Sequence, residues 1–145
     1  MPKVEYVIDA SVAVKWFTQK DEMNLEKAIE LLRLHQARKC SLVAPNLIIY
    51  EVANALRYNR NLTTERVRLA VVGLIKLQME LVGCDEEGFL PRAVDLAREN
   101  DITLYDAIYL ALAKVRGSVL ISADTKMLDK LGATAYAVHL KDLEL

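Results

Sequence analysis

The sequence predicts an α/β fold, a three-layer α/β/α sandwich in which helices cover both faces of a central, mainly parallel sheet. Two observations lead to this prediction. Short runs of β-branched residues alternate along the chain with longer segments of helical periodicity, and two of these runs are closely followed by an acid. Parallel strands need a crossover of a dozen or more residues, usually a helix, so this alternation is typical of a parallel sheet.

The predicted strands are short and rich in valine, leucine and isoleucine. They are residues 4–8, 42–44, 118–122 and 135–139. The segments between them have apolar residues at helical spacing. The predicted helices begin at residue 10 and cover residues 24–35, 46–58, 65–81, 89–100, 104–115 and 124–131. The first 44 residues thus predict a strand–helix–strand unit.

Several predicted helices carry end signals or an unusual face. Thr63 or Thr64 can cap the helix over residues 65–81, and Gly117 ends the helix before it in a left-handed conformation. The helix over residues 46–58 is apolar on most sides, which predicts a buried helix. Together with the next helix it predicts an αα hairpin. Apolar residues on this pair exceed what the sheet can cover, which suggests an interface.

Length and composition predict one domain over residues 1–145. The chain is 53% hydrophobic and 27% charged, which excludes disorder over any large segment. Its net charge of -1 at pH 7 lacks the positive balance of a general DNA-binding protein, so contacts with nucleic acid have to be local. Cys40 and Cys84 are far apart and have no second thiol or histidine at ligand spacing, which argues against a zinc site and a redox pair.

The amino-terminal residues do not resemble a targeting segment. Glu5 and Asp9 interrupt the apolar stretch that a signal peptide would need. The longest apolar windows, residues 47–56 and 108–113, are well below the roughly 20 residues that a membrane span requires. We therefore expect a soluble cytoplasmic protein that has no contact with a membrane.

Four acids are candidate functional residues, and each has a structural alternative. Asp9 can cap the helix that follows the first strand, and Asp124 can cap the helix that it precedes. Asp106 follows Thr103 at the spacing of a capping box. Glu51 is different, because it lies in the middle of an apolar helix where an unpaired carboxylate is costly to bury. It needs a partner or a metal.

Considered together, the four acids favour a metal site. Asp9 and Asp124 follow strands, and ligands gather at the carboxyl ends of strands in a parallel α/β sheet. Glu51 and Asp106 lie near the starts of helices that flank such strands, so all four carboxylates can converge there. Like charges this close raise one another's pKa values, whereas Mg²⁺ or Mn²⁺ neutralises them, and all-oxygen ligation favours these cations over zinc. Asn54 lies one turn after Glu51 and can orient its carboxylate.

Four segments carry a resemblance to a known family. They are Val-Ile-Asp9-Ala-Ser11, Pro45 with Tyr50-Glu51-Val-Ala-Asn54-Ala-Leu56, Thr103-Leu-Tyr-Asp106-Ala-Ile-Tyr-Leu-Ala-Leu-Ala, and Leu-Ile-Ser122-Ala-Asp124-Thr-Lys-Met-Leu. Over residues 4–131 the chain resembles the PIN-domain ribonucleases, and most of all the VapC toxins of toxin-antitoxin pairs. Ser122 stands where many members of that family have threonine, and it keeps the hydroxyl.

The resemblance implies a PIN-like sandwich and a metal-dependent endoribonuclease that cuts single-stranded RNA. The site residues that it implies are the acidic ligands Asp9, Glu51, Asp106 and Asp124, with Ser11 and Asn54 as supporting polar groups. The implied cofactor is Mg²⁺ or Mn²⁺, as one ion or two. The resemblance further implies a homodimer that is held by a paired antitoxin protein.

Other residues have weaker functional interpretations. The candidate contacts to RNA phosphates are Lys15, Arg57 and Arg60. Trp16 is expected to pack in the core rather than to stack on a base. His35 and His139 are expected to lie far from the acids, in packing or surface roles, which disfavours a histidine general base.

Three alternatives stay open at this point. A phosphohydrolase of the haloacid dehalogenase type also begins with an aspartate after its first strand, but it has a second aspartate two residues later, where this chain has Ser11. A nuclease that processes RNA without an antitoxin, and an RNA-binding module without catalysis, would share the predicted fold. The presence of all four acids argues against the module.

Overall fold

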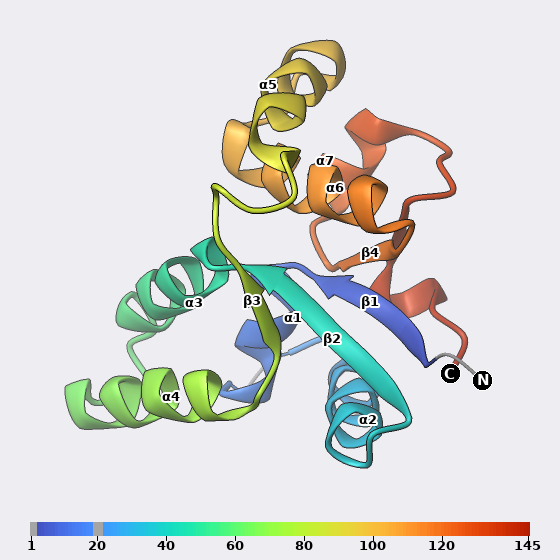
Figure 1. Cartoon of the computed structure of the whole chain (residues 1–145). Helices are drawn as coiled ribbons and strands as arrows, with labels where there is room; N and C mark the ends of the chain where they lie inside the picture. Colours follow the sequence, from blue (N-terminus) through green and yellow to red (C-terminus); the bar gives the residue numbers. More distant parts are fainter. Residues whose placement is uncertain (1–2, 19–21) are drawn as a thin grey trace.

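The computed structural model describes residues 3–18 and 22–145, and a five-stranded sheet forms its centre (Figure 1). The strands are β1 (Val4–Ile8), β2 (Cys40–Pro45), β3 (Glu80–Val82), β4 (Val119–Ser122) and β5 (Ala137–His139). Their order is β3-β2-β1-β4-β5, and each neighbouring pair is parallel. This sheet confirms the predicted parallel α/β fold.

Helices cover both faces of the sheet, as predicted. They are α1 (Ala10–Ala13), α2 (Leu25–Gln36), α3 (Leu47–Arg57), α4 (Thr64–Lys76), α5 (Phe89–Asn100), α6 (Leu104–Arg116) and α7 (Thr125–Leu131), with the short 3-10 helices η1 (Val14–Trp16) and η2 (Leu140–Asp142). In Figure 1, α5 and α6 lie above the sheet and α1 and α2 lie below it. α6 contacts β1, β2 and β4, whereas α2 contacts β2 from the opposite face. The molecule therefore has three layers.

The middle of the sheet is buried on both faces. The consecutive residues Val7 and Ile8 on β1, and Leu120 and Ile121 on β4, have no exposed surface. Successive side chains of a strand point to opposite faces, so only a sheet covered on both sides can bury neighbours in this way. The predicted strands accordingly have continuous apolar runs instead of alternating ones.

The predicted helix over residues 65–81 is too long, because a strand lies within it. α4 ends at Lys76, and residues 80–82 form β3 at the edge of the sheet beside β2. Gln78 has a left-handed backbone conformation (φ 58°) that ends the helical path between the two elements. Leu77 and Leu81 continue the helical spacing, so periodicity hides this strand. β3 forms through its pairing with β2, which a local pattern does not reveal.

The prediction that α3 is buried on most sides is also wrong. Ile48, Val52 and Leu56 form one fully buried stripe, whereas Tyr50 is 73% and Tyr58 is 70% exposed. α3 contacts α1 and α4, which confirms the predicted αα hairpin. These neighbours cover one side of the helix and leave apolar side chains on the surface.

Two of the predicted helix-end signals agree with the structure. Thr63 Oγ1 accepts a hydrogen bond from the Arg66 N–H (3.2 Å) at the start of α4, and Gly117 ends α6 with φ 62°. The last two strands begin one or two residues later than predicted. Cys40 is buried and Cys84 is exposed, and both are free thiols. Within residues 3–18 and 22–145, no helix combines the length and the apolar composition that a membrane crossing needs.

Candidate active site

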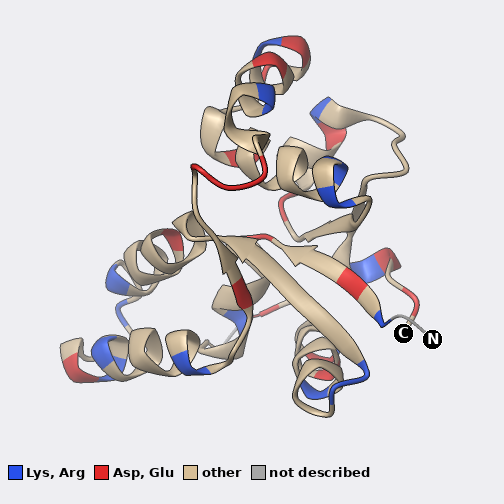
Figure 2. Ribbon diagram, viewed as in Figure 1, with Lys and Arg blue, Asp and Glu red and all other residues tan. Residues whose placement is uncertain are grey.

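The four acids lie at one edge of the sheet, where the parallel strands end. Asp9 directly follows β1 and Asp124 closely follows the neighbouring strand β4 (Figure 2). Glu51 lies on α3, the helix after β2, and Asp106 lies in the first turn of α6. Burial is the largest cause that raises the pKa values of Asp9, Glu51 and Asp106, and charges of other members of the group raise them further. These four residues therefore form one group, called the acid cluster below.

Asp9 is the most buried member of the acid cluster, with 5% of its surface exposed. Its Oδ2 accepts hydrogen bonds from the hydroxyls of Ser11 (2.8 Å) and Ser122 (2.7 Å). Asp9 is the N-cap residue of α1, as the structural alternative has it, but within the described part of the chain its side chain makes no capping hydrogen bond. Burial raises the pKa of Asp9, and the two hydroxyl groups offset this only in part. An ionised Asp9 therefore favours a nearby positive group.

Two serine hydroxyls connect the ends of β1 and β4. Ser11 Oγ accepts a hydrogen bond from the Ala123 N–H (2.8 Å) while it donates to Asp9. Ser122 Oγ accepts from the Asp124 N–H (3.0 Å) while it donates to the same carboxylate. Each hydroxyl thus satisfies one backbone amide and one carboxylate oxygen. The hydroxyl that Ser122 shares with threonine is the group that contacts Asp9.

Glu51 has a partner that the sequence analysis missed. The hydroxyl of Tyr109 donates to Glu51 Oε1 at 2.6 Å, and Tyr109 has no exposed surface. Burial raises the pKa of Glu51, this hydrogen bond lowers it, and the charges of Asp9 and Asp106 raise it again. Tyr109 lies three residues after Asp106 on α6, so the two side chains share a helix face. That spacing is the signal that could have found it.

The capping alternatives for the other two aspartates have different outcomes. At Asp106 the threonine half of the predicted capping box is confirmed, because Thr103 Oγ1 accepts a hydrogen bond from the Asp106 N–H (3.1 Å). At Asp124, Oδ1 accepts from the Met127 N–H (3.1 Å), so capping by this carboxylate is confirmed. The charge of Asp124 is nevertheless among the causes that raise the pKa values of Asp9 and Asp106. A local role and a place in the acid cluster are therefore compatible.

Asn54 and the three candidate RNA-binding cations differ in how far they are exposed. Asn54 lies one turn after the acid of α3 with an exposed side chain, and its role stays a prediction. Lys15 is 7% exposed and forms an ion pair with Glu22 (2.8 Å). This burial against a carboxylate argues against the predicted contact of Lys15 with RNA phosphates. Arg57 and Arg60 are exposed and stay candidates for that contact.

The structure also places Trp16 and the two histidines, for which the sequence predicts packing or surface roles. Trp16 donates from Nε1 to the Ala28 carbonyl (2.8 Å) and packs against the core, as predicted. His139 is closer to the acids than predicted, because the pairing of β5 with β4 places it in register with Ser122. His35 lies in the last turn of α2, beside the start of β2 and at the opposite edge of the sheet, as predicted.

The acid cluster fits a hydrated divalent cation. Among the residues that the structure describes, no lysine or arginine forms an ion pair with any of the four acids. Their donor atoms are all oxygens, which Mg²⁺ and Mn²⁺ prefer. Within residues 3–18 and 22–145, no three histidine, cysteine or acidic side chains form a group that could hold a metal ion. Mg²⁺ usually keeps several waters and binds only one or two carboxylates directly, so it does not need three protein ligands.

These features define an α/β protein with an acidic site at the carboxyl edge of a parallel sheet. The sequence matches the PIN domain family over residues 6–133, so the chain belongs to this family. The match confirms the resemblance that the sequence motifs carry. PIN domains are generally nucleases. Comparison with curated proteins finds no match.

Solved structures of the same fold cover nearly all of the chain. PAE2754 from Pyrobaculum aerophilum is 27% identical, with a TM-score of 0.66 over 95% of this chain and 90% of that chain. A toxin-antitoxin complex from Klebsiella pneumoniae is 20% identical, with a TM-score of 0.63 over 93% of this chain and 97% of that chain. DNA-bound VapBC from Salmonella typhimurium is 17% identical, with a TM-score of 0.68 over 94% of this chain and 98% of that chain.

Proposed function

We propose that this chain is a metal-dependent endoribonuclease that cleaves single-stranded RNA. The observation that carries the proposal is the acid cluster, in which three carboxylates have raised pKa values and lack a lysine or arginine partner among the described residues. Such a site favours a cation that neutralises it. Membership of the PIN domain family supports hydrolysis of phosphodiesters as the reaction.

The proposed chemistry divides between the cation and the protein. When bound, Mg²⁺ or Mn²⁺ supplies Lewis acidity at the phosphodiester and lowers the pKa of the attacking water. Ser11 and Ser122 fix Oδ2 of Asp9, so the carboxylate is held in one orientation before the cation arrives. Tyr109 fixes Glu51 in the same way from α6. The other residues proposed to act at the site are Asp106, Asp124 and Asn54.

A toxin of a toxin-antitoxin pair is the biological role that we infer. Two of the similar structures support it, since one is a toxin-antitoxin complex and another is a VapBC complex bound to DNA. In this role the chain would form a cytoplasmic homodimer that a cognate antitoxin inhibits. Exposed apolar side chains on α3 and α4 support an interface, namely Tyr50 (73% exposed), Leu69 (64%) and Ile75 (55%).

Cleavage of a panel of labelled single-stranded RNAs tests the activity. The wild-type protein is expected to cut with Mg²⁺ or Mn²⁺ and to stop cutting in EDTA. Asp106→Asn is expected to be inactive, whereas Asp95→Asn, the same change at an exposed aspartate of α5, is expected to cut like the wild type. Equal cleavage by Asp106→Asn would show that the acid cluster is structural, and the RNA-binding module without catalysis would then be the better hypothesis.

The partner is tested separately from the activity. A small gene beside the one for this chain, encoding a DNA-binding protein, is expected to yield a complex in which cleavage is suppressed. If cleavage is confirmed and no such protein is co-expressed or inhibits, the chain is a nuclease that processes RNA without an antitoxin.

A further inference from the structure

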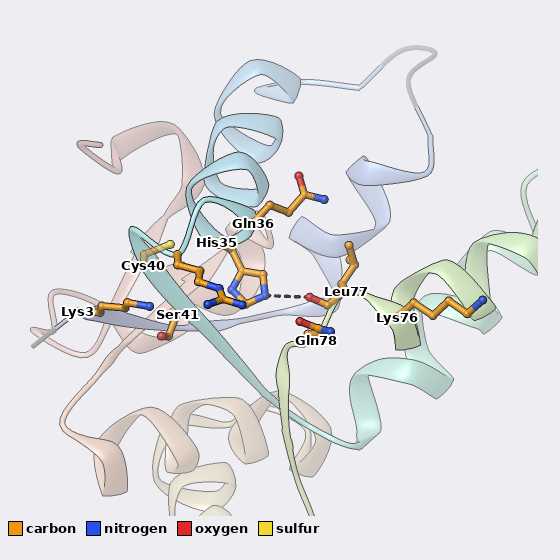
Figure 3. Close-up of a pocket in the computed structure, with 9 residues that line it drawn as sticks. Lys3, His35, Gln36, Cys40, Ser41, Lys76, Leu77 and Gln78 are labelled. Atoms are coloured by element: carbon orange, nitrogen blue, oxygen red, sulfur yellow. Dashed lines mark hydrogen bonds between the residues drawn. The ribbon is translucent and has the colours of Figure 1, made fainter.

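A polar cavity lies at the amino edge of the sheet, away from the acid cluster. It has a volume of about 460 Å³ and lies between the end of α2, the start of β2 and the segment after α4 (Figure 3). The six residues of β2 separate this edge from the carboxyl edge by about 17 Å. The volume is within the range of small-molecule sites, roughly 300–1,000 Å³. The cavity is called the basic pocket below.

The charge of the basic pocket is of one sign. Lys3, Arg38 and Lys76 are among the residues that line it, and the lining includes no acid. Among the described residues these three cations form no ion pair with a carboxylate. Lys and Arg accordingly mark the start of β1, the turn before β2 and the end of α4 (Figure 2). A hollow lined by charges of one sign concentrates ions of the opposite sign.

One wall of the basic pocket is held rigidly by His35. Its Nδ1 accepts a hydrogen bond from the Leu42 N–H (3.3 Å), so the proton of the ring lies on Nε2. Nε2 in turn donates to the Leu77 carbonyl at 3.0 Å, the contact drawn as a dashed line in Figure 3. The imidazole thus ties β2 to the segment after α4, so two walls of the basic pocket are joined by hydrogen bonds.

The backbone of the pocket is held in an unfavourable conformation at two positions. Arg38 (φ 59°) and Gln78 (φ 58°) are both left-handed, although glycine or asparagine adopts this conformation at lower cost. Both residues line the basic pocket and present long polar side chains there. Both residues directly follow a helix C-cap, where the left-handed conformation ends α2 and α4 and turns the chain into the pocket wall.

We propose that the basic pocket binds the phosphate group of a nucleotide. Lys3 and Arg38 supply the positive charge, and the guanidinium of Arg38 can hold two phosphate oxygens at once. Ser41 and Gln78 supply neutral hydrogen-bonding groups that suit a sugar or a base. Lys76 extends away from the cavity in Figure 3 and acts at longer range. The phosphate belongs either to a free mononucleotide or to the backbone of an RNA.

Calorimetric titration tests this site in EDTA, where metal-dependent cleavage does not occur, so the outcome is independent of the proposed nuclease activity. The probes are inorganic phosphate, AMP and a single-stranded RNA dodecamer. The pocket variant is Lys3→Gln with Arg38→Asn, and the control is Arg33→Gln with Lys39→Gln. The control removes two neighbouring exposed cations that do not line the cavity, so both variants lose the same charge.

The pocket variant is expected to weaken binding by about tenfold or more, and the control by less than about twofold. If AMP and inorganic phosphate both bind, the phosphate belongs to a free nucleotide. If the RNA is the one probe of the three that binds, the phosphate belongs to the RNA backbone. Equal weakening by the two variants, or no binding of any probe to the wild type, overturns the proposal. Asparagine tolerates the backbone of position 38, so the variant is expected to keep the wild-type unfolding temperature. If it unfolds, Lys3→Gln alone is compared with Lys39→Gln alone, so that both variants again lose the same charge.

Discussion

Two groups of carboxylates in this protein lie at opposite edges of one sheet and differ in how their charge is balanced. At the amino edge, the guanidinium of Arg116 meets three of them: Nη1 lies 3.2 Å from Glu5, Nη2 2.7 Å from Glu80 and Nε 3.0 Å from Glu87. The hydrogen bond from Arg116 lowers the pKa of Glu80. In the acid cluster, by contrast, burial and mutual repulsion raise the pKa values of three carboxylates.

The difference separates acids that join parts of the fold from acids that favour a ligand. Arg116 connects β1, β3 and the segment before α5, and its charge is used within the chain. No lysine or arginine in the described ranges forms an ion pair with the acid cluster, and Lys130 only partly offsets the causes that raise the pKa of Asp106. A group of acids therefore indicates a site where no ion pair within the fold balances its charge. Whether an acid has an ion-pair partner depends on tertiary structure, and substitutions in the two groups test whether it matters.

The largest effect is expected from Asp106→Asn. The change keeps the shape of the side chain but removes a charge that a cation would bind, so cleavage should fall by on the order of 10²–10³-fold or more. It also removes a charge disfavoured by burial and by Asp9, so the metal-free protein should unfold at a higher temperature than the wild type. Cleavage rates and thermal unfolding in EDTA measure both effects.

Glu80→Gln is the matched control, because it neutralises an acid that already has a partner. Cleavage should be unchanged, and the unfolding temperature should fall slightly as a contact with Arg116 is lost. If Asp106→Asn and Glu80→Gln both lose cleavage, or if both keep it, the lack of an ion-pair partner does not distinguish the acid cluster from the acids around Arg116.

A smaller effect is expected from Tyr109→Phe. Removal of the hydroxyl leaves Glu51 without its 2.6 Å hydrogen bond, so its carboxylate loses orientation. Changes of this kind cost about 10–100-fold in metal affinity or activity. The dependence of cleavage on Mg²⁺ concentration should therefore shift to higher concentrations. Tyr105→Phe, which removes an exposed hydroxyl one residue before Asp106, should behave as the wild type. An equal shift in both variants would remove the positioning role from Tyr109.

Arg116→Met is expected to act on stability alone. Methionine keeps the aliphatic part of the side chain but leaves three carboxylates together without a cation. The Arg116 side chain is 17% exposed and Glu80 is 56% exposed, so screening limits the loss in free energy of unfolding to about 1–2 kcal/mol. Urea denaturation measures it, with Arg98→Met on the exposed face of α5 as control. Unchanged stability would show that the Arg116 contacts do not hold the fold.

Features that depend on local patterns could be predicted from the sequence, whereas contacts between distant segments could not. The strands that carry Asp9 and Asp124 are predicted correctly, since their continuous apolar runs report burial on both faces. Short-range patterns do not report pairings between distant segments. The strand β3 was missed for this reason, and so were the contact of Tyr109 with Glu51 and the place of His139 beside β4.

The smallest effect is a dependence of stability on pH that differs between the two groups of acids. In the metal-free protein, the folded-state pKa values of Asp9, Glu51 and Asp106 are raised, so these acids destabilise the fold when ionised. That cost is fully present above the folded pKa values and is relieved as the pH falls through them. The folded-state pKa of Glu80 is lowered, so its contribution is present above the unfolded pKa and is lost as the pH falls through the folded value.

Urea denaturation in EDTA from pH 7 to pH 3 separates the two cases. The gain in stability from Asp106→Asn should shrink first, because the raised pKa values of the wild-type acids are reached first as the pH falls. The loss from Glu80→Gln should persist to lower pH. Mg²⁺ at pH 7 should abolish the gain from Asp106→Asn and leave the loss from Glu80→Gln unchanged, because Glu80 already has an ion-pair partner and the described residues give the acid cluster none. If Mg²⁺ changes neither difference, the raised pKa values reflect burial alone and give no support to a cation site.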